Sequence, residues 1–97
     1  MFARVSTFSG DPQEIGQFES SLTESALPAA RQIAGFKGVL AMVDRSSGKS
    51  LTVTFWESEQ AMKDSEEAAD RIRQDAAEAS GEQILGVERF EVVLDER

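Results

Sequence analysis

The chain has 97 residues and a formal net charge of −8, and it contains no cysteine, histidine, asparagine or tyrosine. A chain of this length typically forms one domain, so residues 1–97 are expected to fold as a single unit. The absence of cysteine excludes disulfides and thiolate chemistry, and the absence of histidine removes the commonest metal ligand and general base. The acidic balance disfavours binding to nucleic acid or to anionic membranes.

The sequence contains no run of about 18 apolar residues, so no transmembrane helix is expected. Its first residues do not show a basic segment followed by an apolar block, which is the pattern of a secretory signal. A cytoplasmic location is therefore expected.

Residues 2–8 alternate along the chain in the manner of a β-strand. The following Gly-Asp-Pro sequence ends that strand and favours a helix start, with Asp11 as N-cap, Pro12 at the first position and Glu14 completing a capping box. The helix is expected to run from about Pro12 towards Leu27.

Pro28 cannot continue an unbroken helix without the loss of a hydrogen bond. We therefore expect a kink or restart there, with residues 29–33 as a short second piece and Gly35 as its C-terminal glycine. The apolar face of the first piece includes Ile15, Phe18 and Leu22.

Residues 38–56 are typical of a β-hairpin whose strands are apolar on both faces. A three-residue turn over 46–48, with Gly48 in the left-handed region, fits the sequence, and a two-residue Ser-Gly turn is the alternative. The choice matters because a one-residue slip exchanges the faces. The three-residue turn predicts one face of Val39, Ala41, Val43, Leu51, Val53 and Phe55, and another of Leu40, Met42, Thr52, Thr54 and Trp56.

Ser58 can cap a second helix from Glu59 to about Ala79, which Gly81 would end. The predicted inner stripe consists mostly of small residues, so it either packs closely against its neighbour or leaves a cavity. That stripe is Met62, Ser65, Ala69, Ile72 and Ala76; the predicted solvent face is Lys63, Glu66, Glu67, Asp70, Arg71, Arg73, Asp75 and Glu78.

A last strand is expected from about Ile84 to Leu94, which is long enough to pair beyond its own subunit. The resulting order of strand, helix, strand, strand, helix, strand predicts an α+β, ferredoxin-like βαββαβ fold. Its four-stranded antiparallel sheet would carry two helices on one face. The other face is apolar, so we expect it to be covered by a second copy of the chain in a homodimer.

This element order and several local motifs resemble the antibiotic-biosynthesis-monooxygenase-like group of the dimeric α+β barrel superfamily. The resemblance covers essentially the whole chain and implies a homodimer whose sheets form a barrel, with a pocket in each subunit. The group includes cofactor-independent monooxygenases acting on polycyclic aromatic compounds, haem-degrading enzymes and isomerases that handle aldehydes. The motifs are Gly35-Phe36-Lys37-Gly38, Val39–Asp44, Gly48 and Val53-Thr54-Phe55-Trp56-Glu57-Ser58.

The resemblance matches Trp56 to a tryptophan used by several enzymes of the group. Its haem-degrading branch needs histidine and asparagine, which are absent here, so no haem is expected. Its monooxygenase branch uses asparagine, tyrosine and arginine, of which only arginine is present. We expect no metal site and no cofactor.

Trp56 could stack on an aromatic ligand, or it could serve only as a wall of the core. Arg4 and Arg89 lie in strands expected to be neighbours, where either could bind a carboxylate or enolate. The alternative for each arginine is an ion pair with an acidic neighbour such as Glu88 or Glu91. The candidate ligand contacts are Thr52, Thr54, Met62, Phe18 and Leu22.

Two functions follow. The first is cofactor-free oxidation or isomerisation of a small aromatic or carbonyl compound, with Trp56 positioning it and Arg4 or Arg89 stabilising negative charge. The second is a non-catalytic ligand-binding or structural dimer that retains the fold without the polar catalytic residues.

Overall fold

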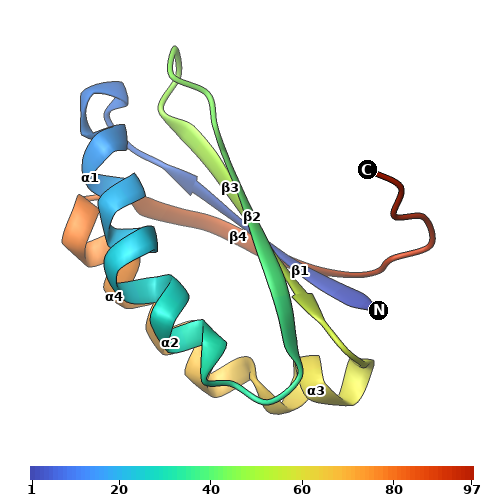
Figure 1. Ribbon diagram of the computed structural model, residues 1–97. Coiled ribbons are helices and arrows are strands. Elements are labelled where there is room, and N and C mark those ends of the chain that lie inside the picture. The colour runs from blue at the N-terminus through green and yellow to red at the C-terminus, as the bar shows by residue number, and fades with distance from the viewer.

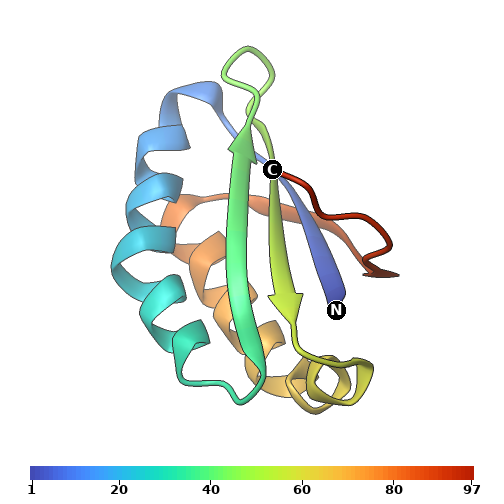
Figure 2. The same cartoon turned by 45° about the vertical axis from the view of Figure 1, so that its right-hand side comes forward.

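The computed structural model describes residues 1–97, and its elements follow the predicted order. The strands form one antiparallel sheet, and the helices lie together on one of its faces (Figures 1 and 2). None of the helices is both long and apolar enough to cross a membrane. The elements are β1 (Phe2–Ser9), the 3-10 turn η1 (Pro12–Glu14), α1 (Ile15–Ser21), the π-helical turn η2 (Leu22–Ala26), α2 (Leu27–Arg31), β2 (Phe36–Val43), β3 (Lys49–Trp56), α3 (Glu59–Asp64), α4 (Glu66–Ser80) and β4 (Gln83–Glu91).

The strand order is β2-β3-β1-β4, which confirms the predicted ferredoxin-like sheet. β1 lies at the centre, with Arg4 opposite Thr54 of β3 on one side and opposite Arg89 of β4 on the other. The prediction that Arg4 and Arg89 lie on neighbouring strands is therefore confirmed. A core of Phe8, Phe18 and Ala77, with Leu22 and Ile84 packed against it, joins the sheet to α1 and α4.

The first helix has the predicted N-cap and first-turn proline, but Glu14 makes no side-chain hydrogen bond that would complete a capping box, and the helix passes Pro28 differently. The Asp11 carboxylate accepts a hydrogen bond from the Gln13 N–H at 2.9 Å. The π turn then bonds the Leu27 N–H to the Leu22 carbonyl, which places Pro28 at the second position of α2. A proline near a helix start has no intrahelical N–H bond to lose, so the irregularity falls one turn before the predicted break. The predicted piece over 29–33 is correspondingly shifted to α2.

Gly35 does not end the helix, because α2 stops at Arg31. It occupies the turn into β2 with a φ of +85°, and a Cβ atom there would lie 2.5 Å from the Cβ of Ala61. A glycine is required at this position both for its backbone conformation and for the close approach of α3.

The hairpin turn is one residue longer than predicted. The Asp44 N–H donates to the Lys49 carbonyl at 2.8 Å, and the Gly48 N–H donates to the Asp44 carbonyl at 2.9 Å, which leaves residues 45–48 as the loop. Gly48 has a φ of +82°, so its predicted left-handed conformation is correct.

The longer loop moves the register by one residue and inverts the predicted faces of β2. Leu40 lies opposite Val53, and Ala41 lies opposite Thr52. Residues opposite each other in register share a face of the sheet. The two predicted faces therefore keep their β3 residues and exchange their β2 residues. Val39 and Ala41 share the helix side with Thr52, Thr54 and Trp56, whereas Leu40 and Met42 share the outer side with Leu51, Val53 and Phe55.

The second helix is interrupted where one continuous helix was predicted. The Ser58 hydroxyl accepts from the Ala61 N–H at 3.1 Å, and Gly81 ends α4 with a φ of 72°, both as expected. The interruption falls at Ser65, between α3 and α4. Two residues predicted to face solvent, Glu66 and Arg73, instead point inward and take part in the site described below.

β4 ends at Glu91, three residues before the predicted end of the last strand. Residues 92–97 leave the sheet (Figure 1), with Val93 and Leu94 exposed. The Arg97 guanidinium lies 5.6 Å from the centre of the Phe55 ring, so the end of the chain contacts the outer face of the sheet. That face also exposes Leu40, Met42 and Phe90, which are 40–49% accessible.

Glu82 is a buried acid whose two carboxylate oxygens have no hydrogen-bond partner. Burial raises its pKa, so its ionised form destabilises the fold, and stability falls as pH rises through the folded pKa. We predict that Glu82→Gln raises the urea midpoint at pH 7 and that this gain shrinks towards pH 4. Exposed Glu78→Gln is the control and should change little; a lower midpoint for Glu82→Gln at pH 7 would contradict the prediction.

Candidate functional site

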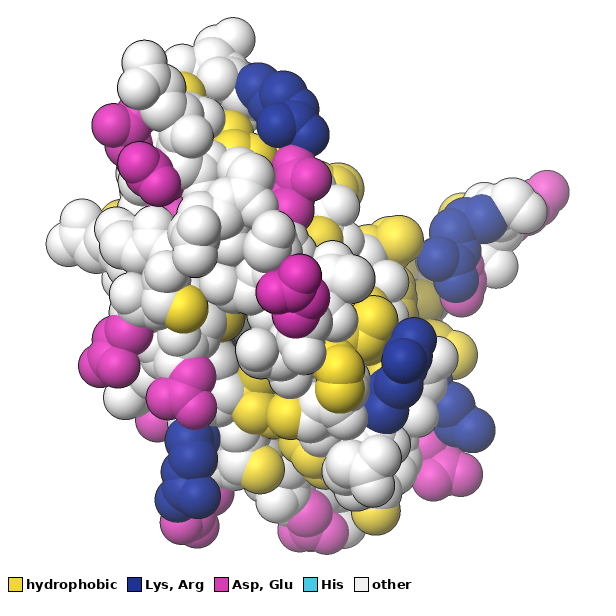
Figure 3. Space-filling view, turned by 60° about the vertical axis from the view of Figure 1, so that its left-hand side comes forward, with side chains coloured by type: hydrophobic (Ala, Val, Ile, Leu, Met, Phe, Trp, Pro, Cys, Tyr) yellow, Lys and Arg dark blue, Asp and Glu magenta, His cyan; other side chains and the backbone are white.

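A cavity of about 200 Å³ lies between the helices and the sheet. Twelve of its 18 lining residues are hydrophobic, and several are alanines whose small side chains leave the space unfilled. Of the two outcomes expected for the small-residue stripe, the structure therefore has the cavity. Figure 3 shows hydrophobic side chains in a hollowed strip, with charged side chains around it. The small helical lining residues are Ala26, Ala30, Ala69 and Ala76.

Arg4 of β1 is a cavity-lining guanidinium that is only 2% exposed. Its Nη2 atom alone makes three contacts with the α3–α4 junction: 2.8 Å to the Met62 carbonyl, 2.9 Å to the Ser65 hydroxyl and 3.1 Å to Glu66. Its Nε and Nη1 atoms are buried without a hydrogen-bond partner. Since buried donors without a partner are costly, these two nitrogens are suited to donate hydrogen bonds to a negatively charged or carbonyl oxygen.

Trp56, at the end of β3, forms the aromatic wall of the cavity and is 1% exposed. Its indole N–H donates to the Thr54 hydroxyl at 3.0 Å, and the edge of Phe36 contacts it with ring centres 5.7 Å apart. The Arg4 guanidinium lies 5.3 Å from the indole centre, a cation–π distance. These contacts fix the indole plane beside the free nitrogens of Arg4.

Arg73 of α4 is a second buried arginine on the cavity wall. Its Nε donates to the Ser6 hydroxyl at 3.1 Å, and its Nη1 pairs with Asp70 at 2.9 Å. Burial and the nearby charge of Arg4 lower its pKa. Two guanidinium groups therefore give a mostly apolar cavity a positive character.

Glu66 lies between Arg4 of the central strand β1 and Arg89 of the edge strand β4. Arg89 binds both of its oxygens, Nε to Oε1 at 2.5 Å and Nη2 to Oε2 at 2.7 Å, whereas Arg4 reaches one oxygen at 3.1 Å. The Arg89 hydrogen bonds, followed by the hydrogen bond from Arg4, lower the Glu66 pKa to about 2. Glu66 is therefore an anion at neutral pH and cannot act as a general base there.

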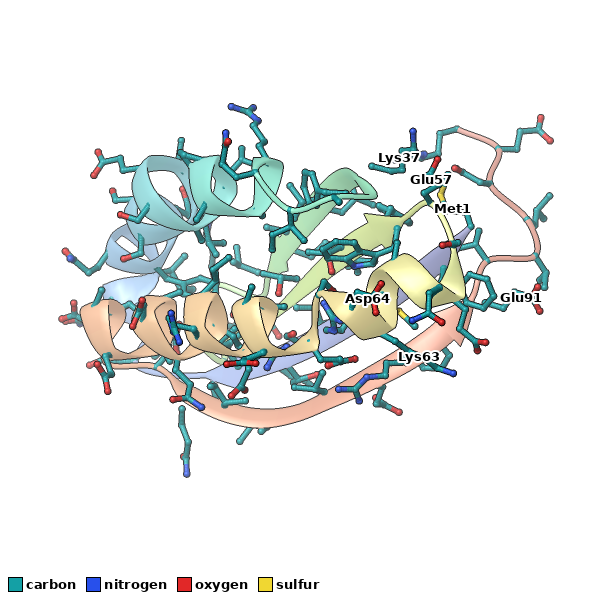
Figure 4. The ribbon with its side chains drawn as sticks, turned by 90° about the horizontal axis from the view of Figure 1, so that it is seen from below. Met1, Lys37, Glu57, Lys63, Asp64 and Glu91 are labelled. Atoms are coloured by element: carbon teal, nitrogen blue, oxygen red, sulfur yellow. The ribbon has the colours of Figure 1, made fainter.

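The other charged side chains near α3 lie outside the cavity. Lys37, Glu57, Lys63, Asp64 and Glu91 surround the α3 end of the molecule (Figure 4), and none of them lines the cavity. No three acidic side chains come together as a metal-binding group. The site can bind a flat, largely apolar molecule and stabilise one negative charge on it.

Comparison with known proteins identifies the fold and two uncharacterised relatives. No protein-family sequence model matches the chain. Two uncharacterised proteins of Mycobacterium tuberculosis H37Rv, Rv2558 and Rv2557, are 32% identical over 77 residues and 30% identical over 97 residues. Those matches cover 79% and 100% of this chain but only 33% and 43% of the relatives, so the chain spans less than half of their lengths.

The solved structures match over nearly their whole length. A candidate antibiotic biosynthesis monooxygenase from Deinococcus radiodurans has a TM-score of 0.72 and 21% identity, covering 100% of this chain and 97% of that one. The chain has the fold of the antibiotic biosynthesis monooxygenases. SnoaB from Streptomyces nogalater, a cofactor-independent oxygenase, superposes on this fold with a TM-score of 0.70 and 16% identity, covering 97% and 94% of the two chains. The ActVA-Orf6 monooxygenase of Streptomyces coelicolor, solved with nanaomycin D, has a TM-score of 0.67 and 17% identity, covering 98% and 92%.

Within this monooxygenase fold, five of the eight predicted site residues line the cavity and three do not. Arg89 lies outside it and is 46% exposed, because its guanidinium turns to Glu66 and not to Glu88 or Glu91. Phe18 packs against Phe8 in the core, with ring centres 5.0 Å apart. Met62 contributes its carbonyl to Arg4 while its side chain is buried elsewhere. The five lining residues are Trp56, Arg4, Thr52, Thr54 and Leu22.

Sequence reasoning missed Glu66 and Arg73, which the monooxygenase fold brings to the cavity region. Arg73 lies four residues after Ala69, and Glu66 lies four residues after Met62, both members of the predicted inner stripe. Residues four apart share a helix face, so this spacing could have revealed them. Their charge was the reason for placing them in solvent.

The lowered pKa of Glu66 predicts that the free energy of unfolding decreases at low pH. A carboxylate with a folded pKa of about 2, against an ordinary 4.5, stabilises the fold above pH 4.5, and this contribution is lost as pH falls towards 2. We predict that Glu66→Gln loses about 1–2 kcal/mol of unfolding free energy at pH 7, after discounting for partial exposure, and little at pH 2.5. Urea titrations at both pH values measure this. Exposed Glu67→Gln is the control; an equal loss for Glu66→Gln at both pH values would contradict it.

Proposed function

We propose that this chain binds a flat aromatic compound with an acidic or enolisable group and oxidises it with dioxygen, without a cofactor. The observation that carries the proposal is the side chain of Arg4, buried beside Trp56 with two unpartnered nitrogens in an apolar cavity. A buried cation beside an aromatic plane favours a ligand that is itself planar and negatively charged.

The size of the cavity supports a small ring system. An apolar cavity of about 150 Å³ accommodates benzene. The cavity here, about 200 Å³, has room for a somewhat larger molecule, on the scale of two or three fused rings. Trp56 would stack on that ring system, and Thr52 and Thr54 lie on the same wall.

The chemistry requires the ligand to lose a proton before it reacts. Arg4 and Arg73 would favour the enolate over the neutral form and so lower the pKa of the bound group. The enolate carbon of a ring methylene then gains one oxygen atom of O₂ and becomes a carbonyl, while the two hydrogens leave with the other oxygen atom as water. The ligand is oxidised and dioxygen is reduced, so the step balances without another reductant.

The proposal is also supported by two proteins with this fold. SnoaB is a cofactor-independent oxygenase, and the ActVA-Orf6 monooxygenase was solved with nanaomycin D bound. Both are less than 20% identical to this chain, so they support the reaction class and do not define the substrate.

A second candidate function is ligand binding without catalysis. It is favoured by the fact that the charged residues lining the cavity are arginines, Arg4 and Arg73, with no carboxylate or other ready proton acceptor among the lining residues. A ligand that is already ionised would then be held without reacting.

Oxygen consumption tests the first function. With anthrone as substrate, the wild type should accelerate oxygen uptake, and Arg4→Gln should lower kcat/KM by about 10²-fold because it removes charge stabilisation from the reacting anion. Trp56→Phe should lower kcat/KM as well, since the smaller ring stacks less well. Exposed Arg71→Gln carries the same charge change and should leave activity unaltered.

The outcome separates the two functions. Uptake no faster than in buffer rejects the oxygenase. Trp56 is the only tryptophan and there is no tyrosine, so the intrinsic fluorescence reports directly on this cavity. Quenching by anthrone without oxygen uptake would support binding alone, and an absence of both would reject the cavity as an aromatic site.

We also propose that the chain forms a homodimer through the outer face of its sheet. Leu40, Met42 and Phe90 are exposed there, and no helix covers them (Figure 2). A second copy would present the same apolar surface, and burial of both would favour association.

Charge on that face tests the dimer. Val53→Asp should shift the sedimenting species from dimer to monomer at micromolar concentration, because a dimer would bury the new carboxylate. Ser47→Asp, in the hairpin loop, is the matched control and should remain dimeric. A wild-type chain that sediments as a monomer would rule out the proposal.

A further inference from the structure

Arg89 does not line the cavity, but it shares the carboxylate of Glu66 with Arg4, which does. Arg89 lies on β4, Glu66 at the start of α4 and Arg4 on β1, and the three side chains form a continuous chain of ion pairs. Three elements far apart in the sequence therefore meet behind the cavity wall.

The carboxylate of Glu66 is shared unequally. Arg89 takes both oxygens at 2.5 and 2.7 Å, which is the bidentate geometry that holds a carboxylate most firmly. Arg4 reaches only Oε1, at 3.1 Å, and does so with Nη2, the nitrogen already bound to Met62 and Ser65. The Nε and Nη1 atoms of Arg4 are left without partners.

We propose that Arg89 is a positioning residue that acts through Glu66 and keeps Arg4 available to an anionic ligand. This inference rests on the proposed function for the existence of that ligand. If Arg89 were absent, Glu66 could turn both oxygens to Arg4 and neutralise the charge that faces the cavity. Arg89 thus sets how strongly the site prefers an anion over a neutral molecule of the same shape.

The charges around Glu66 agree with the proposed roles of Arg89 and Arg4. Arg4 of β1 and Arg89 of β4 face it directly, and Arg73 of α4 senses its charge at longer range while pairing with Asp70. The hydrogen bonds from Arg89 are the largest cause of the lowered Glu66 pKa. Loss of Arg89 should therefore raise that pKa and allow Glu66 to be protonated at mildly acidic pH.

The test compares two probes of equal shape by calorimetry at pH 7. The anion is 2-naphthalenesulfonate, and the neutral control is 2-naphthalenesulfonamide. Arg89→Gln should weaken sulfonate binding about 5- to 10-fold and alter sulfonamide binding less than twofold. Arg71→Gln, which removes an exposed arginine of α4, should alter neither.

A double-mutant cycle shows whether the effect passes through Glu66. In a Glu66→Gln background, Arg89→Gln should no longer change sulfonate affinity. An equal loss in both backgrounds would mean that Arg89 acts only by its own charge and would overturn the inference. In the single variant Arg89→Gln, sulfonate affinity should recover as pH falls from 5 to 3.5, whereas the wild type should stay constant.

A measurement without ligand separates this inference from the proposed function. Carbon-13 NMR titration of the Glu66 carboxyl should give a pKa well below the ordinary value in the wild type and a higher one in Arg89→Gln. If neither naphthalene probe binds the wild type, the proposed ligand site fails, while the titration still decides the role of Arg89. An unaltered Glu66 pKa in Arg89→Gln would overturn that role.

Discussion

The attachment of Arg4 to the α3–α4 junction is the interaction around which the site is built. A guanidinium on the central strand is buried under the helix layer, where its Nη2 meets a backbone carbonyl, a hydroxyl and a carboxylate within one helical turn. The Met62 carbonyl also accepts hydrogen bonds from the Ser65 hydroxyl at 2.6 Å and the Ser65 N–H at 3.3 Å, so the end of α3 and Arg4 share it. This shared carbonyl joins the interruption at Ser65 to β1 and holds the second helix over the sheet at a defined place.

The cavity follows from what surrounds that attachment. The alanines of η2, α2 and α4 are too small to fill the space between the helix layer and β3, while Trp56 closes one side. A void edged by two guanidinium nitrogens without hydrogen-bond partners is unfavourable when empty, because neither dispersion contacts nor hydrogen bonds are complete. A bound ligand would complete both kinds of contact. The combination of small residues and buried arginines therefore supports a ligand site more strongly than either feature alone.

Most of the fold could be anticipated from local patterns. The alternation in residues 2–8, the Asp11 and Ser58 caps and Gly81 after α4 are short-range signals, and the elements follow the predicted order. The bounds of α2, the break between α3 and α4 and the end of β4 differ from the prediction. Trp56 was a site candidate because the family resemblance matches it to a tryptophan used by several enzymes, and Arg4 because its strand was expected to neighbour that of Arg89. Arg89 was misplaced because periodicity specifies a face of the sheet but not whether a helix end covers that point.

The sequence by itself determined the element order, the caps and the ferredoxin-like sheet, since these depend on neighbours within a few residues. Only the tertiary structure decided the hairpin register, the passage of the helix past Pro28 and the inward turn of Glu66 and Arg73. The register depended on one extra loop residue, which costs little locally but exchanges two faces of a strand. The two charged residues turn inward because partners from β1 and β4 compensate their burial, and such partners become neighbours only when the chain has folded.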